Sequence, residues 1–212
     1  MITFENTKVF NIARAVYSAR NPLNSWDKSD SDLYNDILGE NDLKLAQNLV
    51  KAGSDHRKFM RQIFVTVDIT APLYWWKEAD TYKVGTVANS CSTMHTIHKK
   101  EFTVDDFSCE HLEWLPVDNV GMYDFKWILD GVIRALNMAR KMYLKTGDKK
   151  YWRQMIQLLP SSYNQRRTIT MNYENIRNMY HARKNHKLDE WSKGFVEWID
   201  TLPYAEELIK IQ

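Results

Sequence analysis

The stretch that decides the fold runs from Asp55 to His98 and reads DHRKFMRQIFVTVDITAPLYWWKEADTYKVGTVANSCSTMHTIH. Within it, Ile63, Val65, Val67 and Ile69 alternate with other residues in the segment from Gln62 to Ile69, and this period of two predicts a strand with one buried face. Pro72 limits the strand, and the segment LYWWKEADTY that follows it is predicted to continue as a helix. The stretch ends in small hydroxyl, amide and thiol side chains. We therefore interpret it as a scaffold followed by a site.

Apolar residues at helical spacing predict helices through much of the remaining chain. The predicted ranges are Lys8 to Arg20, Leu33 to Lys51 (one helix, or two broken at Gly39), Tyr123 to Thr146 closed by Gly147, Lys149 to Leu159, Asn172 to Arg183, and Leu188 to Leu202. Two further segments are predicted to be less regular: a loop with at most a short helix from Thr103 to Trp114, and a polar strand or loop from Ser161 to Thr170. The pattern predicts an α+β fold, rich in helix, in a single domain of residues 1–212.

The composition is that of an ordinary folded domain. The chain has 212 residues, of which 44% are apolar and 26% charged, and its formal net charge is +2. This charge is too small to indicate a nucleic-acid partner, and no segment is long and apolar enough to span a bilayer. Two cysteines, Cys91 and Cys109, do not make a disulfide framework, and no apolar signal segment follows Met1. We therefore expect a soluble protein of the reducing cytoplasm.

Residues of the central stretch and its continuation could in principle bind zinc. The candidate ligands are Cys91, His95, His98, Cys109 and His111. Structural zinc sites usually show pairs of close ligands, whereas the spacing here is irregular, so the sequence predicts no metal site. A Ser-His-Asp triad has no G-x-S-x-G elbow to support it.

The second half of the chain contains a more specific spacing in the segment LPSSYNQRRTITMNYENIRNMYHAR. It places Asn172, Asn178 and Arg183 in one predicted helical segment, with further arginines nearby. The planar guanidinium group suits a carboxylate, a phosphate or the edge of a pyrimidine. The alternative interpretation is a solvated basic helix face, and local charge alone leaves both interpretations open.

Read together, the two stretches resemble the flavin-dependent thymidylate synthases over most of the chain. In that family R-H-R-x-x-S-x-N-E-x-S-x-R-Y follows a histidine turn, a strand and a helix. A later L-P segment leads into T-x-N-x-R-x-L-x-N-F-x-x-x-R. Here the pair Leu159 and Pro160 precedes, at the intervals of the family, Thr170, Asn172, Asn178 and Arg183. Glu174 stands where the family has an arginine, and Asp189 where it has a glutamine.

The first half carries the other part of the resemblance. His56 falls at the histidine turn of the family, Val65 to Pro72 at its strand, and Glu78 at the position of a glutamine. The triplet Arg-His-Arg is replaced by Thr81, Tyr82 and Lys83, and the following serine by Thr86. After one inserted residue, the positions of Asn, Glu, Ser and Arg are taken by Asn89, Ser90, Ser92 and Met94.

The resemblance implies a fold and a chemistry. The implied fold is a single α+β domain with a small, mainly antiparallel sheet and a helical bundle. The family forms homotetramers that bind FAD and dUMP at subunit junctions, methylenetetrahydrofolate donates the carbon, and NADPH reduces the flavin. The catalytic residues implied are Arg183, which would polarise the pyrimidine, and Ser92. Substrate would also be bound by Glu78 and Ser90, and the flavin by His56, Lys83, Asn89, Asn172 and Asn178.

Three interpretations of function follow. The first is a flavin enzyme that transfers one carbon to C5 of dUMP or a related pyrimidine nucleotide. The second is a homologue that binds nucleotide or flavin with altered or absent catalysis. The third is a structural oligomer that keeps only the fold, because one fold can host different functions.

Overall fold

The computed structural model describes residues 2–117 and 121–212. The chain divides into two compact units, each built from segments distant in sequence. Unit 1 comprises residues 70–78 and 90–166, and unit 2 comprises residues 2–69, 79–89 and 167–212. The prediction of one domain over residues 1–212 stays a prediction.

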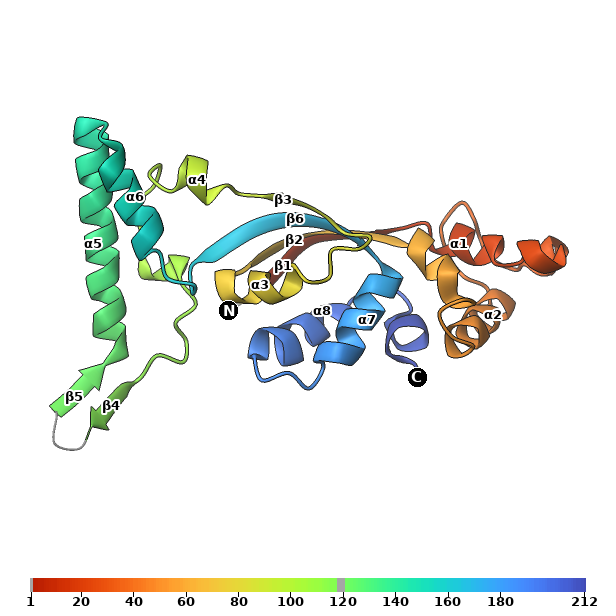
Figure 1. Cartoon of the computed structure of the whole chain (residues 1–212). Helices are drawn as coiled ribbons and strands as arrows, with labels where there is room; N and C mark the ends of the chain where they lie inside the picture. The colour runs from red at the N-terminus through yellow and green to blue at the C-terminus, as the bar shows by residue number, and fades with distance from the viewer. Residues whose placement is uncertain (1, 118–120) are drawn as a thin grey trace. The chain divides into compact units, whose positions relative to one another are not determined.

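The main sheet has four strands, whose bounds are β1 (Thr3–Phe10), β2 (Phe64–Pro72), β6 (Asn164–Asn172) and β3 (Val87–Ser90), in the order β1-β2-β6-β3 (Figure 1). In β2 the alternate side chains from Val65 to Ala71 are buried, which confirms the strand predicted from its period of two. Two backbone hydrogen bonds of 3.0 Å join the segments at the two ends of the β2–β6 pair. The N–H of Tyr173 donates to the carbonyl of Ile63, and the N–H of Leu73 donates to the carbonyl of Tyr163. This register makes β2 and β6 antiparallel, and the small antiparallel sheet predicted for the chain is confirmed.

Unit 2 contains most of the helices around this sheet. Its helical elements are α1 (Ile12–Ser18), the short 3₁₀ helices η1 (Asn21–Leu23) and η2 (Trp26–Lys28), α2 (Glu40–Lys51), the 3₁₀ helix η3 (Arg57–Gln62), α7 (Tyr173–Arg183), the π-helical η5 (Glu190–Phe195), α8 (Val196–Asp200) and the π-helical η6 (Ala205–Lys210). α7 contacts η3, η5 and η6. The largest buried side chains of the unit include Trp191, Tyr173 and Phe195, so the aromatic residues of the C-terminal segment form its core.

Two helix predictions in unit 2 are wrong in part. Residues 8–10 belong to β1, and Asn11, with a φ of 71°, separates that strand from α1. Residues 33–36 form a turn rather than the start of a helix, because the Asp32 carboxylate accepts the backbone N–H groups of Tyr34 and Asn35 and an isolated antiparallel bridge joins Asp32 to Ile37. Such side-chain bonds to the backbone compete with a helix. α2 therefore begins only at Glu40, with Gly39 as its N-cap.

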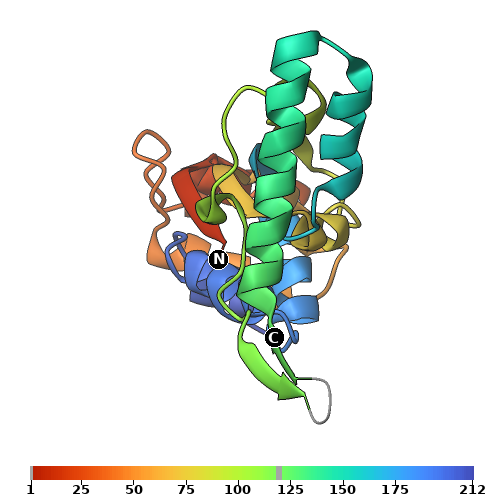
Figure 2. The same cartoon turned by 90° about the vertical axis from the view of Figure 1, so that its left-hand side faces the viewer.

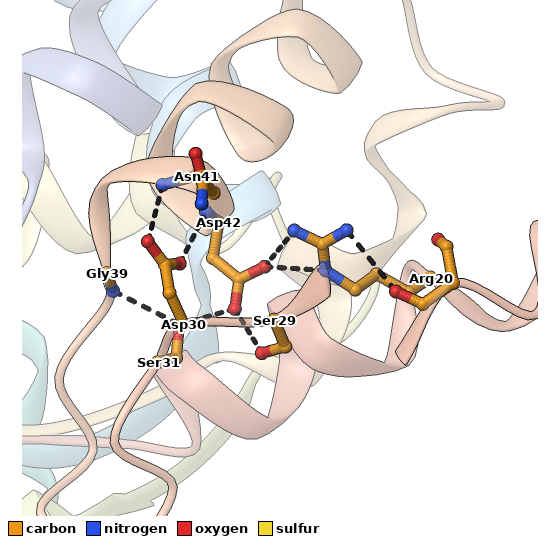
Figure 3. A network of polar contacts seen from close by, with 8 residues as sticks. Arg20, Ser29, Asp30, Ser31, Gly39, Asn41 and Asp42 are labelled. Atoms are coloured by element: carbon orange, nitrogen blue, oxygen red, sulfur yellow. Dashed lines mark hydrogen bonds and ion pairs between the residues drawn. The ribbon is translucent and has the colours of Figure 1, made fainter. Parts of the chain in front are cut away.

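A buried ion pair anchors the segment between α1 and α2 (Figure 3). Asp42 is fully buried, and its Oδ1 accepts from Arg20 Nε at 2.6 Å and lies 2.5 Å from Nη2. Its Oδ2 accepts from the hydroxyl groups of Ser29 and Ser31, both at 2.5 Å. The Asp30 carboxylate accepts the N–H groups at the first turn of α2. This network satisfies the buried charges and fixes a segment that has little apolar core of its own.

Unit 1 is dominated by two long helices, α5 (Phe125–Thr146) and α6 (Lys149–Leu158), which lie side by side (Figure 2). Its other elements are α3 (Leu73–Ala79, whose last residue belongs to unit 2), α4 (Thr93–Thr96), a 3₁₀ turn (Val104–Asp106), and an antiparallel hairpin of β4 (Trp114–Val117) and β5 (Gly121–Asp124). Asp124 caps the start of α5 and Gly147, with a φ of 68°, closes its end, as the sequence predicted for the glycine. The core between α5 and α6 includes Leu136 and Met155, both fully buried.

In the two ranges that the structure describes, no helix combines the length and hydropathy needed to cross a membrane.

Candidate functional site

Arg183 lies at the end of α7 in unit 2 and is held by two aromatic side chains. Its Nε donates to the Tyr82 hydroxyl at 2.9 Å. Its guanidinium carbon lies 5.6 Å from the Tyr82 ring centroid and 5.4 Å from that of Trp191. Stacking and a hydrogen bond together fix the plane of the guanidinium, which remains half-exposed.

The turn before β3 is fixed against the N-terminus of α7. Asn172 caps α7 by accepting the N–H of Asn175 at 2.9 Å, and Asn175 Nδ2 donates to the Val84 carbonyl at 2.6 Å. Gly85 has a φ of +77°, and a Cβ there would lie 2.9 Å from Asn172 Nδ2. Only glycine fits this close approach in a left-handed conformation. The turn that carries Lys83 is therefore positioned by α7, and Asn172 has a structural role in holding it.

The other flavin-binding residues predicted in unit 2 present side chains on its surface. His56, Lys83, Asn89 and Asn178 are all exposed. His56 immediately precedes η3 and lines a pocket of about 480 Å³ whose other lining residues include Ser18, Asn21, Lys58 and Gln62. The four predicted residues, His56, Lys83, Asn89 and Asn178, each offer hydrogen-bond donors to an anion or a carbonyl group.

Glu174, which stands in place of an arginine of the resembled family, is paired with two arginines of η3. Its carboxylate lies 3.5 Å from Arg57 Nε and accepts a hydrogen bond from Arg61. The bond from Glu174 raises the pKa of Arg61. The cluster of Arg57, Arg61 and Glu174 carries a net positive charge, because two guanidinium groups face one carboxylate.

In unit 1 the segment from Ser90 to Ser92 is attached to the start of β6. Cys91 N donates to the Arg166 carbonyl at 2.9 Å, and Gln165 Nε2 donates to the Cys91 carbonyl at 2.8 Å. Ser92 is the N-cap of α4, and its hydroxyl accepts the N–H of His95 at 3.3 Å. The backbone of this segment is thus fixed on both sides of Cys91.

A pocket of about 260 Å³ lies beside this segment, and two of its lining side chains are cations, Lys100 and Arg166. Its other lining residues are Thr70, Cys91, Thr93, Thr96, Asp105, Asp106, Tyr163, Asn164 and Gln165. Lys100 forms an ion pair with Asp106, and this hydrogen bond raises the pKa of Lys100. Burial raises the pKa of Tyr163, so that its phenol keeps its proton near neutral pH. The lining carries two cations and two carboxylates, Asp105 and Asp106, so it is formally neutral and offers both donors and acceptors of hydrogen bonds.

The predicted site residues fall into two groups. Glu78, Ser90 and Ser92 belong to unit 1, and the remaining six, His56, Lys83, Asn89, Asn172, Asn178 and Arg183, belong to unit 2. The sequence placed Arg166 only among the arginines near the Asn172–Arg183 segment and gave no role to Lys100, because no local pattern links either residue to Cys91. Within residues 2–117 and 121–212, no group of three or more histidine, cysteine or acidic side chains is arranged to hold a metal ion.

Comparisons with known proteins show which solved structures share this fold. No protein-family model and no curated protein matches the sequence. The structure is similar to thymidylate synthase X from Helicobacter pylori, a flavin-dependent enzyme solved with FAD and dUMP, at a TM-score of 0.68 and 16% identity, over 99% of this chain and 96% of that chain. It is also similar to the UMP/dUMP methylase PolB from Streptomyces cacaoi, solved with 5-Br dUMP, at a TM-score of 0.62 and 16% identity, over 99% and 95% of the two chains. The chain has the fold of the flavin-dependent thymidylate synthases, as the sequence predicted.

Proposed function

We propose that this protein binds a pyrimidine nucleotide and FAD and transfers one carbon from methylenetetrahydrofolate to C5 of dUMP or a related nucleotide. NADPH would supply the electrons, and the active form would be a homotetramer with its sites at subunit junctions. The observation that carries the proposal is the fixed guanidinium of Arg183, at the end of a helix in a fold shared with two nucleotide-binding proteins.

Arg183 would act on the pyrimidine ring. Attack at the ring and loss of the C5 proton develop negative charge on a ring carbonyl, and a fixed cation lowers the energy of that charge. Tyr82 and Trp191 hold the guanidinium in one plane, so little reorganisation is needed when the charge develops. Tyr82 stands where the resembled family has a histidine, and here its hydroxyl positions the arginine.

The phosphate of the nucleotide would be bound by residues of unit 1. Ser90 and Ser92 lie in the segment fixed to β6, and the adjacent pocket contributes Lys100 and Arg166. Glu78, at the end of α3, would add a carboxylate acceptor for the nucleotide.

The side chains of unit 2 fit the acceptors of a flavin. Lys83 offers an ammonium group to the phosphates, and His56, Asn89 and Asn178 offer donors to ring carbonyls, all from the surface. Asn172 would contribute by holding the turn that carries Lys83. When bound, FAD would supply the hydride that completes the transferred carbon, which no side chain can supply.

The proposal is tested with purified protein in three steps. A flavin absorbance band, or a rise in thermal midpoint with FAD and dUMP, is expected, since a ligand at a hundredfold excess over its dissociation constant stabilises by about 2.7 kcal/mol. Release of tritium from C5-labelled dUMP or dCMP is then expected with folate and NADPH present. Arg183→Ala should abolish nucleotide binding and leave the fold intact. A protein that gains no stability from either ligand would contradict the proposal.

The second candidate is a protein that binds nucleotide or flavin without catalysis. It is favoured by the replacement of Arg-His-Arg with Thr81, Tyr82 and Lys83, which leaves one cation for flavin phosphates in that triplet. Ligand-induced stabilisation without tritium release would identify it. Absence of both would leave the third interpretation, a structural oligomer.

A further inference from the structure

One helix of unit 1 carries two apolar faces. The inner face of α5, which includes Leu129, Ile133 and Leu136, packs into the core shared with α6. The outer face carries a second row of apolar and small side chains, three or four residues apart, which we name the α5 stripe: Trp127, Ile128, Gly131, Ala135, Met138 and Met142. A solvated outer face would be polar, so this helix is apolar on more of its circumference than a surface helix needs.

Five of the six stripe residues are exposed to solvent, and Met142 is half-buried. Trp127 is 65% exposed and Met138 is 61% exposed. Within unit 1, α6 packs beside α5 (Figure 2), against the inner face rather than the stripe. A row of large exposed apolar side chains along one helix indicates a contact surface, whereas single exposed apolar residues are normal.

Gly131 strengthens this interpretation. It lies in the middle of a helix of 22 residues, where glycine destabilises relative to alanine. A Cβ at this position would meet nothing within 4 Å, so no neighbour in the chain requires the glycine. Ala135, one turn later, is also small and exposed. A second helix that approaches α5 closely at this point would explain both residues, because small side chains allow backbones to come together.

We propose that the α5 stripe binds the α5 stripe of a second copy of this chain, in an antiparallel pair about a two-fold axis. An axis that crosses the helix near residues 132 and 133 places Gly131 against Ala135 of the second copy. The same axis places Trp127 against Met138 at both ends, so each large side chain meets a flexible one. From Trp127 to Met142 the contact is about 22 Å long at 1.5 Å per residue.

Charge at the edge of the stripe favours the same partner and the same direction. Asp130 and Arg134 are both exposed and lie one turn apart beside the stripe. In the antiparallel pair, Asp130 of one copy lies opposite Arg134 of the other, and the two-fold axis makes this contact twice. A parallel pair would instead place like charges together, which opposes association.

The α5 contact rests on the homotetramer of the proposed function and would be one of the contacts between its copies. Sedimentation velocity of the full chain over a range of concentrations is the measurement. Met138→Lys and Gly131→Leu should each raise the dissociation constant of the pair about tenfold or more, whereas Leu144→Lys should not. Leu144 is a matched control, because it lies on α5 with 55% exposure but outside the stripe. Circular dichroism and thermal midpoints check that each variant is folded.

Charge exchange tests the partner and its direction. Asp130→Arg alone and Arg134→Asp alone should each lose self-association, because each places like charges opposite each other. A mixture of the two variants should associate again, because both contacts across the axis become complementary. Charges within each chain are the same in the mixture as in the separate variants, so only contact between copies can restore association.

The inference is overturned if the wild-type chain is monomeric at every concentration, if Met138→Lys associates as strongly as wild type, or if the mixture of charge variants stays apart. None of these readouts needs flavin or nucleotide. Failure of the proposed chemistry, seen as no ligand-induced stabilisation and no tritium release, is therefore distinguishable from failure of the α5 contact.

Discussion

Replacing Asp42 with alanine is expected to destabilise the protein by about 3–5 kcal/mol, because Arg20 then remains buried without its carboxylate. Arg20 is 7% exposed and Asp42 is 0% exposed, so water cannot take the place of the missing group without local unfolding. The two serine hydroxyl groups that donate to Asp42 lose their acceptor in the same variant.

The size of this effect follows from burial. A partner removed from a buried ion pair leaves an uncompensated charge, whereas an exposed pair contributes at most about 1 kcal/mol. For a chain of this length a loss of 3–5 kcal/mol lowers the thermal midpoint by about 6–20 °C. The double variant Arg20→Met with Asp42→Leu removes both charges, and it should lose less than half as much as Asp42→Ala.

Urea denaturation followed by circular dichroism measures these differences, with the m-value as a check that the transition stays comparable. Glu40→Ala is the matched control on the same helix, because its pair with Lys44 is 3.8 Å long and exposed on both sides. It should change stability by about 0.5 kcal/mol or less. A loss below about 1 kcal/mol for Asp42→Ala, or an equal loss for the double variant, would refute the reasoning.

Three further predictions concern unit 2. Gly85→Ala should destabilise the protein by about 1–3 kcal/mol in urea denaturation, more than the control Gly53→Ala, and equal losses would contradict the steric argument. Both glycines have positive φ, but only Gly85 has a neighbour that a Cβ would strike. Burial holds the pKa of His181 below its usual value, so the unfolded chain binds the proton first and stability should fall as pH decreases below about 6.5; His181→Gln should flatten that fall, and an unchanged slope would disprove it. Tyr82→Phe keeps the ring that stacks on Arg183 but removes its acceptor, so calorimetry should show weaker dUMP binding with the fold retained, and unchanged affinity would oppose the positioning role.

The elements that the sequence predicted correctly are those with local signals. β2 follows from its alternation, and α5 from an apolar stripe that ends at Gly147. β1 and β3 were missed because their side chains are largely exposed and lack a clean period of two. Their conformation is decided by pairing with strands distant in sequence, and such tertiary context overrides local propensity.

The candidate site depends more than the fold on contacts between residues distant in sequence, and its residues stay a prediction. Arg183 and Asn172 lie in a segment with characteristic spacing, so their neighbourhood could be identified from sequence. Arg166 lines the same pocket as Cys91 and Lys100 although it is distant from both along the chain. Only the folding of β6 against the Ser90 segment brings them together, and no local pattern records that contact.

Under the proposed function, Tyr82 takes a positioning role at a place where the resembled family has a histidine. A histidine at this position in the family is replaced here by a side chain that cannot carry a positive charge, which by itself indicates a weaker anion site. The structure gives the tyrosine another partner, because its hydroxyl accepts from Arg183 while its ring packs beside Trp191, with centroids 6.3 Å apart. A phenol at this position can fix a guanidinium that a protonated imidazole would repel. The replacement thus trades one cation for the orientation of another, and binding of a planar, weakly charged ring depends more on orientation than on total charge.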